Sequence, residues 1–330
     1  MLENHPPASG PSAAPIAKLL NDYYRVGWDR VESPGPLFPP RRADVAQEII
    51  QLWKKYSAEL SDLSAQLNVQ YEKKAAQGYT GGCGDAEGEW LYILIRELKP
   101  SLIYEISPNT GFSTNYLLAA VTANETGRIE GFEIIEEFNG LSINEVIDGH
   151  LLSTCDKERY HLNVGDARIY ALERIANEAP DFTLIDSCHD DFFAEFYIKE
   201  LLPRLRGTVV MQDLAHFDPR PEWSTEAYYV LSYLQKTDSE YLLFGDYEDE
   251  LSNSNVRSEY ALRRPCRSNC IVVSLDENPV TSDPTTNMVG YLKQELEQGQ
   301  EMASEYPLTF TSLGRNLNRP VPLVHDRPED

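Results

Sequence analysis

The stretch Ile103-Tyr-Glu-Ile-Ser-Pro-Asn-Thr-Gly-Phe-Ser-Thr114 is the most informative part of this sequence. Its first residues predict a buried β-strand, Leu102–Ile106, and the residues after Ser107 predict a tight turn that opens a helix. Gly111 can supply the left-handed backbone that such a turn needs, and Ser113 or Thr114 can cap the helix. Ligands of open α/β sheets bind outside the carboxyl ends of the strands, so this turn is the first candidate site.

Strand-like and helix-like segments alternate on both sides of this turn. The predicted strands are Leu102–Ile106, Ile129–Ile134, Tyr160–Val164, Phe182–Ile185 and Thr208–Met211, and the predicted helices are Glu87–Leu98, Ser113–Val121, Leu141–Leu152, Ala167–Ala176 and Phe192–Leu202. Such repeated units predict an α/β fold with a Rossmann-like, doubly wound, mostly parallel sheet. Two closing strands, Tyr241–Phe244 and Cys270–Leu275, are separated by a long polar insertion and predict an antiparallel edge hairpin.

The chain divides into four parts. Residues 1–42 form a proline-rich arm or linker, residues 43–78 a helical extension, residues 79–275 the Rossmann-like domain and residues 276–330 a C-terminal extension. Apolar residues at three- and four-residue spacings over Ala43–Ala76 predict one long amphipathic helix or two shorter ones. The apolar surface of this arm and helix favours a homo-oligomer, although nothing in the sequence sets its stoichiometry.

The charge and the cysteines limit the partners and the compartment. A formal net charge of −24 argues against nucleic acid and against anionic membranes as partners. The five cysteines are dispersed and include no CxxC pair, which favours free thiols in a reducing compartment. Because the sequence shows neither an export signal nor an apolar run long enough to span a membrane, we expect a cytoplasmic protein.

The sequence Glu105-Ile-Ser-Pro-Asn-Thr-Gly-Phe-Ser-Thr114 resembles motif I of class I S-adenosylmethionine-dependent methyltransferases, which commonly reads E-I-G-x-G-x-G-x-S-T. Four later stretches resemble the same family in order and spacing, so that the resemblance covers about half of the chain. These stretches are Gly131-Phe-Glu-Ile134, Asn163-Val-Gly-Asp-Ala167, Phe182-Thr-Leu-Ile-Asp-Ser-Cys-His189 and Leu202-Pro-Arg-Leu-Arg-Gly-Thr-Val-Val-Met-Gln-Asp213. The group most similar in appearance is that of small-molecule O-methyltransferases, several of which bind a divalent cation.

The resemblance implies a set of cofactor-binding residues. It assigns Glu133 to the ribose hydroxyls and Asp166 to the adenine amino group of S-adenosylmethionine. The full implied set is Glu105, Ser107, Asn109, Gly111, Ser113, Glu133, Asp166, Ala167 and Asp186. The sequence departs from the family where Ser107 and Asn109 replace two glycines and Cys188 replaces the second acid of D-G-D-H.

Methyl transfer to a hydroxyl needs a base or a Lewis acid. Asp186 and Asp213 follow neighbouring predicted strands and could hold Mg²⁺, with Gln212 as a third oxygen ligand. His189 and Asp186 are the candidate catalytic residues, with His189 as the base if no metal binds. The expected acceptor is a small molecule.

Two other readings remain. A methyltransferase-fold protein that has lost catalysis could act as a binding or assembly subunit, which the three substitutions in the motifs would suit. The same fold could also bind another dinucleotide or a nucleotide sugar, although the sequence lacks G-x-G-x-x-G.

Overall fold

The computed structural model describes residues 42–77, 85–187, 191–214, 239–247, 253–257 and 270–275, together with residues 226, 230, 231, 233, 234 and 251. The expected N-terminal arm and C-terminal extension lie outside the described residues. The sequence also predicts a helix at Thr225–Leu234, and the structure describes that segment only in part.

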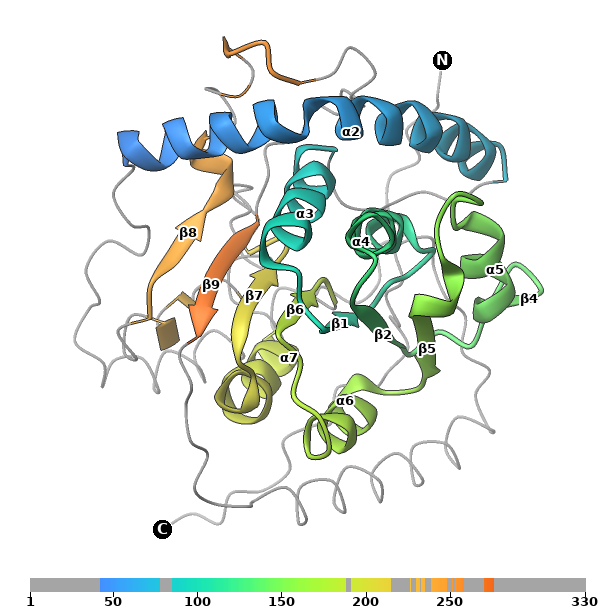
Figure 1. The fold of residues 1–330 in the computed structure, drawn as a ribbon. Helices are drawn as coiled ribbons and strands as arrows, with labels where there is room; N and C mark the ends of the chain where they lie inside the picture. The colour runs from blue at the N-terminus through green and yellow to red at the C-terminus, as the bar shows by residue number, and fades with distance from the viewer. Residues whose placement is uncertain are drawn as a thin grey trace, which may run out of the picture.

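Seven strands form one sheet in the order β5-β2-β1-β6-β7-β9-β8 (Figure 1). Their bounds are β1 Leu102–Ile106, β2 Arg128–Glu133, β5 Tyr160–Val164, β6 Phe182–Ile185, β7 Gly207–Met211, β8 Tyr241–Leu243 and β9 Ile271–Leu275. The pairs among β5, β2, β1, β6 and β7 are all parallel, and their order is that of a doubly wound sheet. β9 runs antiparallel to both β7 and β8, which confirms the expected antiparallel edge.

Helices cover both faces of the sheet (Figure 1). Their bounds are α2 Ala43–Ala76, α3 Asp85–Leu98, α4 Phe112–Asn124, α5 Ile143–His150, α6 Ala167–Ile175 and α7 Asp191–Phe196. Buried residues of α2, α3, α4 and α5 share one apolar cluster, and those of α6 and α7 share another. Within β1, Ile103 faces the first cluster and Tyr104 the second, as the alternation of a strand requires.

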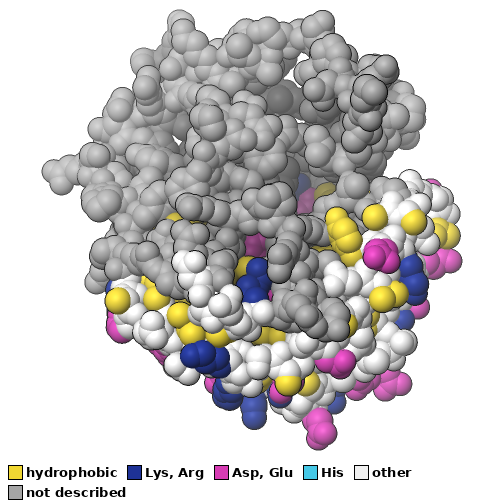
Figure 2. All heavy atoms as spheres, turned by 90° about the horizontal axis from the view of Figure 1, so that it is seen from above, with side chains coloured by type: hydrophobic (Ala, Val, Ile, Leu, Met, Phe, Trp, Pro, Cys, Tyr) yellow, Lys and Arg dark blue, Asp and Glu magenta, His cyan; other side chains and the backbone are white. Residues whose placement is uncertain are grey.

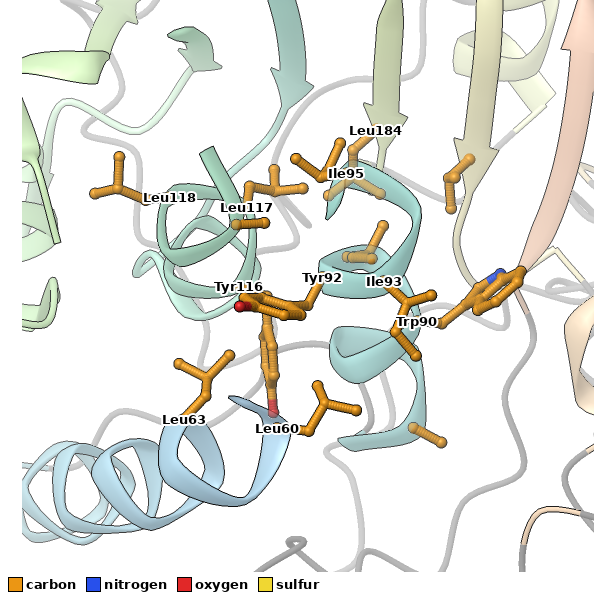
Figure 3. Close-up of a cluster of buried hydrophobic side chains, with 14 of the residues drawn as sticks. Leu60, Leu63, Trp90, Tyr92, Ile93, Ile95, Tyr116, Leu117, Leu118 and Leu184 are labelled. Carbon is orange, nitrogen blue, oxygen red and sulfur yellow. The ribbon is translucent and has the colours of Figure 1, made fainter. Parts of the chain in front are cut away.

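α2 is one continuous helix that lies across α3 and α4 (Figure 1). Leu60 and Leu63 point from it towards the side chains of α3 and α4 (Figure 3). Nearer the start of the helix, the buried ring of Trp53 stacks on Trp90 and Phe244 at centroid distances of 5.5 and 5.6 Å. The helical extension is therefore part of the folded core rather than a separate appendage.

The structure differs from the expected helix Leu141–Leu152 at its start. Leu141 and Ser142 form the short strand β4, which pairs antiparallel with β3, Glu137–Phe138, and α5 begins only at Ile143. Asn139 and Gly140 join the two strands with φ angles of 52° and 81°, the left-handed pair that a two-residue hairpin turn needs.

The expected helix Phe192–Leu202 also changes character along its length. It is α-helical up to Phe196, becomes a π-helix, Tyr197–Leu201, and ends in the 3₁₀ turn Leu202–Arg204. Pro203 lacks the amide hydrogen that another helical turn would use, which accounts for the end of the helix.

Two further observations concern the apolar length of the helices and the distribution of charge on the surface. No helix among the described residues is long and apolar enough to cross a membrane. On the described part of the face in Figure 2, positive and negative side chains are interspersed among apolar ones.

Candidate functional site

The residues that follow the parallel strands form one continuous edge of the sheet. The amide of Ser107 donates to the Phe132 carbonyl at 2.8 Å, and the amide of Gly165 donates to the Glu133 carbonyl at 2.7 Å. On the other side of β1, the amide of Asp186 donates to the Ile106 carbonyl at 3.2 Å. The ladder thus continues past the strand ends and brings the candidate residues of four strands to one edge.

The turn after β1 uses three left-handed residues. Ser107, Asn109 and Gly111 have φ angles of 64°, 52° and 79°. Gly111 is the N-cap of α4 and no side chain caps this helix, so the expected capping by Ser113 or Thr114 is wrong. The hydroxyls of those two residues bond to Glu105 instead.

Glu105 lies behind the turn and is completely buried. Its carboxylate accepts hydrogen bonds from Ser113 Oγ at 2.7 Å and from Thr114 Oγ1 at 2.8 Å. Burial raises the pKa of Glu105 to about 7, against the lowering effect of these hydroxyls. Glu105 therefore anchors the start of α4 to β1 and changes charge near neutral pH.

Glu133 links the ends of β1 and β2. Its Oε2 accepts from the Asn109 amide at 2.8 Å and its Oε1 accepts from the Ile135 amide at 2.9 Å, while the residue is 2% exposed. Burial raises the pKa of Glu133, and the backbone N–H groups oppose that rise because they stabilise the charged form. Each carboxylate oxygen keeps a second lone pair for a ligand hydroxyl.

Asp166 follows β5 and is the N-cap of α6. It accepts from the Arg168 amide at 2.9 Å and forms an ion pair with the Arg168 guanidinium, and it is 6% exposed. The neighbouring Ala167 is the first residue of α6 and is also buried. The structure thus places Asp166 at the expected edge, in a helix-capping role.

The residues expected to act in catalysis follow β6 and β7. Asp186 and Gln212 are adjacent across the sheet, because the Gln212 amide donates to the Ile185 carbonyl at 2.9 Å. Asp213 has a left-handed φ of 57°, and both aspartates are half-buried. His189 and Cys188 lie outside the described residues.

The donor set fits Mg²⁺ only incompletely. Asp186 and Asp213 are the hard oxygen donors that Mg²⁺ prefers, and Gln212 adds an amide whose nitrogen is buried without a hydrogen-bond partner within the described part of the chain. Across that same part, no three His, Cys, Asp or Glu residues converge as a metal cluster would. No chemical step is therefore assigned to a metal here.

Sequence reasoning missed two residues that bind the turn from behind. Lys74 of α2 donates from Nζ to the Thr110 carbonyl at 2.9 Å, and His150 Nδ1 lies 3.0 Å from the same oxygen. Both side chains are buried. In the sequence, Lys74 is one of two lysines in the last turn of a helix, a pattern typical of a solvated helix end.

Two exposed apolar side chains flank the same edge and were also missed. Ile134, directly after Glu133, is 54% exposed, and Tyr170 of α6 is 44% exposed. The Tyr170 ring lies against Gly165, where an added Cβ would meet it at 2.1 Å. Apolar surface beside strand-end carboxylates would suit a planar base.

A hollow of about 470 Å³ lies elsewhere, between α2 and the end of α3. Its charged lining residues pair with one another, with Lys55 bound to Glu97 and Arg96 bound to Glu59. Lys99, which also lines it, precedes β1, so the hollow lies towards the amino ends of the strands. It is not part of the candidate site.

No protein-family model matches the chain, and no curated protein matches it in sequence. Solved structures similar to it include an O-methyltransferase from Bacillus cereus in complex with SAH, at 15% identity over 68% of this chain and 98% of that chain, with a TM-score of 0.46. The cofactor-bound Rv0187 from MTB has 18% identity over 65% and 91% of the two chains and a TM-score of 0.46.

The O-methyltransferase TomG from Streptomyces achromogenes, solved with SAM, has 15% identity over 64% and 89% of the two chains and a TM-score of 0.45. Since these scores are low, the assignment of a Rossmann-like fold rests on this chain's own strand order and pairing.

Proposed function

We propose that this protein is an S-adenosylmethionine-dependent methyltransferase that methylates a hydroxyl of a small molecule. The observation that carries the proposal is the shared sheet edge, where the motif I turn meets Glu133 through the Asn109 amide. The strand-end residues expected from the sequence, Asp166 and Asp186, follow strands of the same edge. Such an edge is the usual ligand-binding face of a doubly wound sheet.

In this proposal, different residues of the sheet edge bind different parts of the cofactor. Glu133 is held in place by two backbone N–H groups, so its free lone pairs can accept the two ribose hydroxyls without a change of rotamer. Ile134 and Tyr170 offer apolar surface beside it for the adenine. Asp166 stays near this end of the cofactor with Arg168 as its ion-pair partner.

The sulfonium of S-adenosylmethionine supplies an activated methyl group. In the proposed reaction, that methyl passes in line to the acceptor oxygen, the hydroxyl proton moves to a base, and S-adenosylhomocysteine leaves. Asp186, at the end of β6, is the proposed residue beside the methyl, with His189 as the base. If a magnesium ion binds, Asp186 and Asp213 would be the residues that hold it, and it would supply a Lewis acid near the acceptor hydroxyl.

Calorimetry with S-adenosylhomocysteine tests the proposal on the full chain. We expect saturable binding, together with a rise in melting temperature, because a ligand that binds only the folded state stabilises it. Absence of binding at millimolar ligand contradicts the proposal. Binding without transfer to any of a panel of hydroxylated acceptors would instead favour the binding or assembly role.

The variant Glu133→Gln locates the site. A glutamine has one acceptor oxygen, so it cannot hold both the Asn109 and Ile135 amides and also accept the ribose hydroxyls. We expect a loss of about 1–3 kcal/mol in S-adenosylhomocysteine affinity by calorimetry. Glu137→Gln, an exposed carboxylate nearby in β3, is the matched control and should bind as the wild type does. Equal affinities of the two variants would remove Glu133 from the site.

A further inference from the structure

Lys74 is a buried lysine whose position calls for an explanation. It lies in the last turn of α2 and is only 4% exposed, although lysine side chains usually reach water. Its Nζ donates to the Thr110 carbonyl at 2.9 Å and lies 5.6 Å from the centre of the Phe112 ring. Both contacts are with the motif I turn and the start of α4.

A second side chain approaches the same carbonyl from α5. His150 Nδ1 lies 3.0 Å from the Thr110 oxygen. Burial and the charge of Lys74 both lower the pKa of His150, so the ring is neutral and its Nδ1–H can donate to that carbonyl. The Thr110 carbonyl is thus held from two helices.

Asn115 of α4 adds further hydrogen bonds around the turn. The side-chain amide of Asn115 donates to the Gly111 carbonyl at 2.9 Å and to the His150 carbonyl at 3.1 Å. Its Oδ1 accepts from the Leu152 amide at 2.8 Å. The turn is therefore held from behind by α2, α4 and α5, and on its other side by Glu133.

The turn itself needs such support. Ser107 and Asn109 occupy left-handed backbone conformations where the resembling motif has glycines. Side-chain-bearing residues disfavour that conformation, and they keep it only when the surroundings hold them there. The ammonium group of Lys74 on the Thr110 carbonyl, directly after Asn109, supplies a fixed contact of this kind.

We propose that Lys74 is a positioning residue for the cofactor: its contact with Thr110 keeps the turn from Ser107 to Gly111 in the conformation that binds S-adenosylmethionine, in place of the missing glycines. The proposal rests on the proposed function for its ligand. The contact itself can be tested without one.

The first experiment compares Lys74→Met with Lys73→Met. Both lysines lie in the last turn of α2, so the two variants change the charge at the helix end equally, but Lys73 is exposed. In the ligand-free protein, we expect amide hydrogen exchange over residues 107–115 to become about tenfold faster in Lys74→Met and to stay unchanged in Lys73→Met. In calorimetry, S-adenosylhomocysteine should bind about tenfold more weakly to Lys74→Met alone.

The second experiment is a double-mutant cycle with restored glycines. Glycine at positions 107 and 109 removes the strain but keeps the backbone amide that Glu133 binds. In the Ser107→Gly/Asn109→Gly background, the loss caused by Lys74→Met should fall from about tenfold to threefold or less. An undiminished loss would overturn the compensation, because the two changes would then act independently.

The outcomes separate the two proposals. If the wild type does not bind S-adenosylhomocysteine, the proposed function fails, and the exchange measurement still decides whether Lys74 holds the turn. If the wild type binds and the two lysine variants behave alike in both measurements, the role of Lys74 is refuted. Should Lys74→Met not fold, Lys74→Gln replaces it, since a glutamine is neutral and shorter and cannot bring an ammonium group to Thr110.

Discussion

Glu105 couples the turn to pH because its carboxyl group is completely shielded from water. Its pKa is raised from an ordinary 4.5 to about 7, chiefly by burial, and also by the charge of Glu133, while Lys74 opposes the rise. The folded protein therefore binds this proton more tightly than the unfolded chain. Its contribution to stability is complete below pH 4.5 and is lost as the pH rises through 7.

The variant Glu105→Gln should remove this pH dependence. A glutamine stays neutral and can still accept from a hydroxyl, so the variant should gain on the order of 3 kcal/mol relative to the wild type between pH 5 and pH 8. Urea unfolding at pH 5, 6, 7 and 8 measures the difference. Glu133 is present in both proteins, so its own titration largely cancels. A difference that is constant over this range would show that Glu105 does not titrate there.

Single residues also show how far the sequence could be read. Glu133, Asp166 and Asp186 were placed at one edge because apolar runs mark where strands end, and parallel strands end on the same side. Lys74 and His150 could not be found in this way. Their role depends on which helix packs against the turn, and a lysine in a helix end gives the same sequence pattern whether it is solvated or buried.

The helix α5 illustrates the same contrast for a whole element. Its apolar spacing predicted a helix from Leu141, and it is indeed helical from Ile143. The Asn139-Gly140 pair, a strong indication of a tight hairpin, could have revealed the β3–β4 ribbon. The apolar spacing favours a helix that begins at Leu141, because Leu141 fits the helical spacing as well as a strand after the turn.

Ser142 joins the ribbon to α5 through a capping box. Its hydroxyl accepts from the Glu145 amide at 3.3 Å, and the Glu145 carboxylate accepts from the Ser142 amide at 2.9 Å. We expect Ser142→Ala to lower stability by about 1 kcal/mol in urea unfolding. Because His150 ends this short helix, amide exchange at the turn should also quicken slightly. Ser153→Ala, at an exposed serine beyond the helix, is the control. If both substitutions lower stability equally, the capping box does not stabilise α5.

The whole molecule is held together by contacts that sequence patterns do not encode. The strand order up to β7 follows from repeated βα units, but the placement of β9 between β7 and β8 depends on a long connection whose path the sequence leaves open. Likewise, the sequence predicts that α2 is an amphipathic helix, but it does not predict which surface of the protein that helix packs against. The structure shows that surface in Trp53, which stacks on rings from α3 and from the segment after β8.

Glu89 joins three distant segments beside these rings. Its carboxylate is buried in α3 and accepts from Trp53 Nε1 at 2.8 Å and from Arg257 Nε and Nη2 at 3.0 Å each. A charge withdrawn from water is stabilised only while its partners remain. Arg257 thus links the 253–257 segment to α3 and, through Trp53, to α2.

Arg257→Met should therefore destabilise the protein by about 3 kcal/mol in urea unfolding at pH 7, because among the described residues it leaves the buried Glu89 carboxylate with Trp53 as its one donor. Arg128→Met, which breaks the exposed pair with Glu178, should cost at most about 1 kcal/mol. Adding Glu89→Gln to Arg257→Met should recover part of the loss, since a neutral amide can still accept from Trp53. If the two arginine variants lose equal stability, or if the double variant is merely additive, then the Glu89 carboxylate does not depend on Arg257 for its stabilisation.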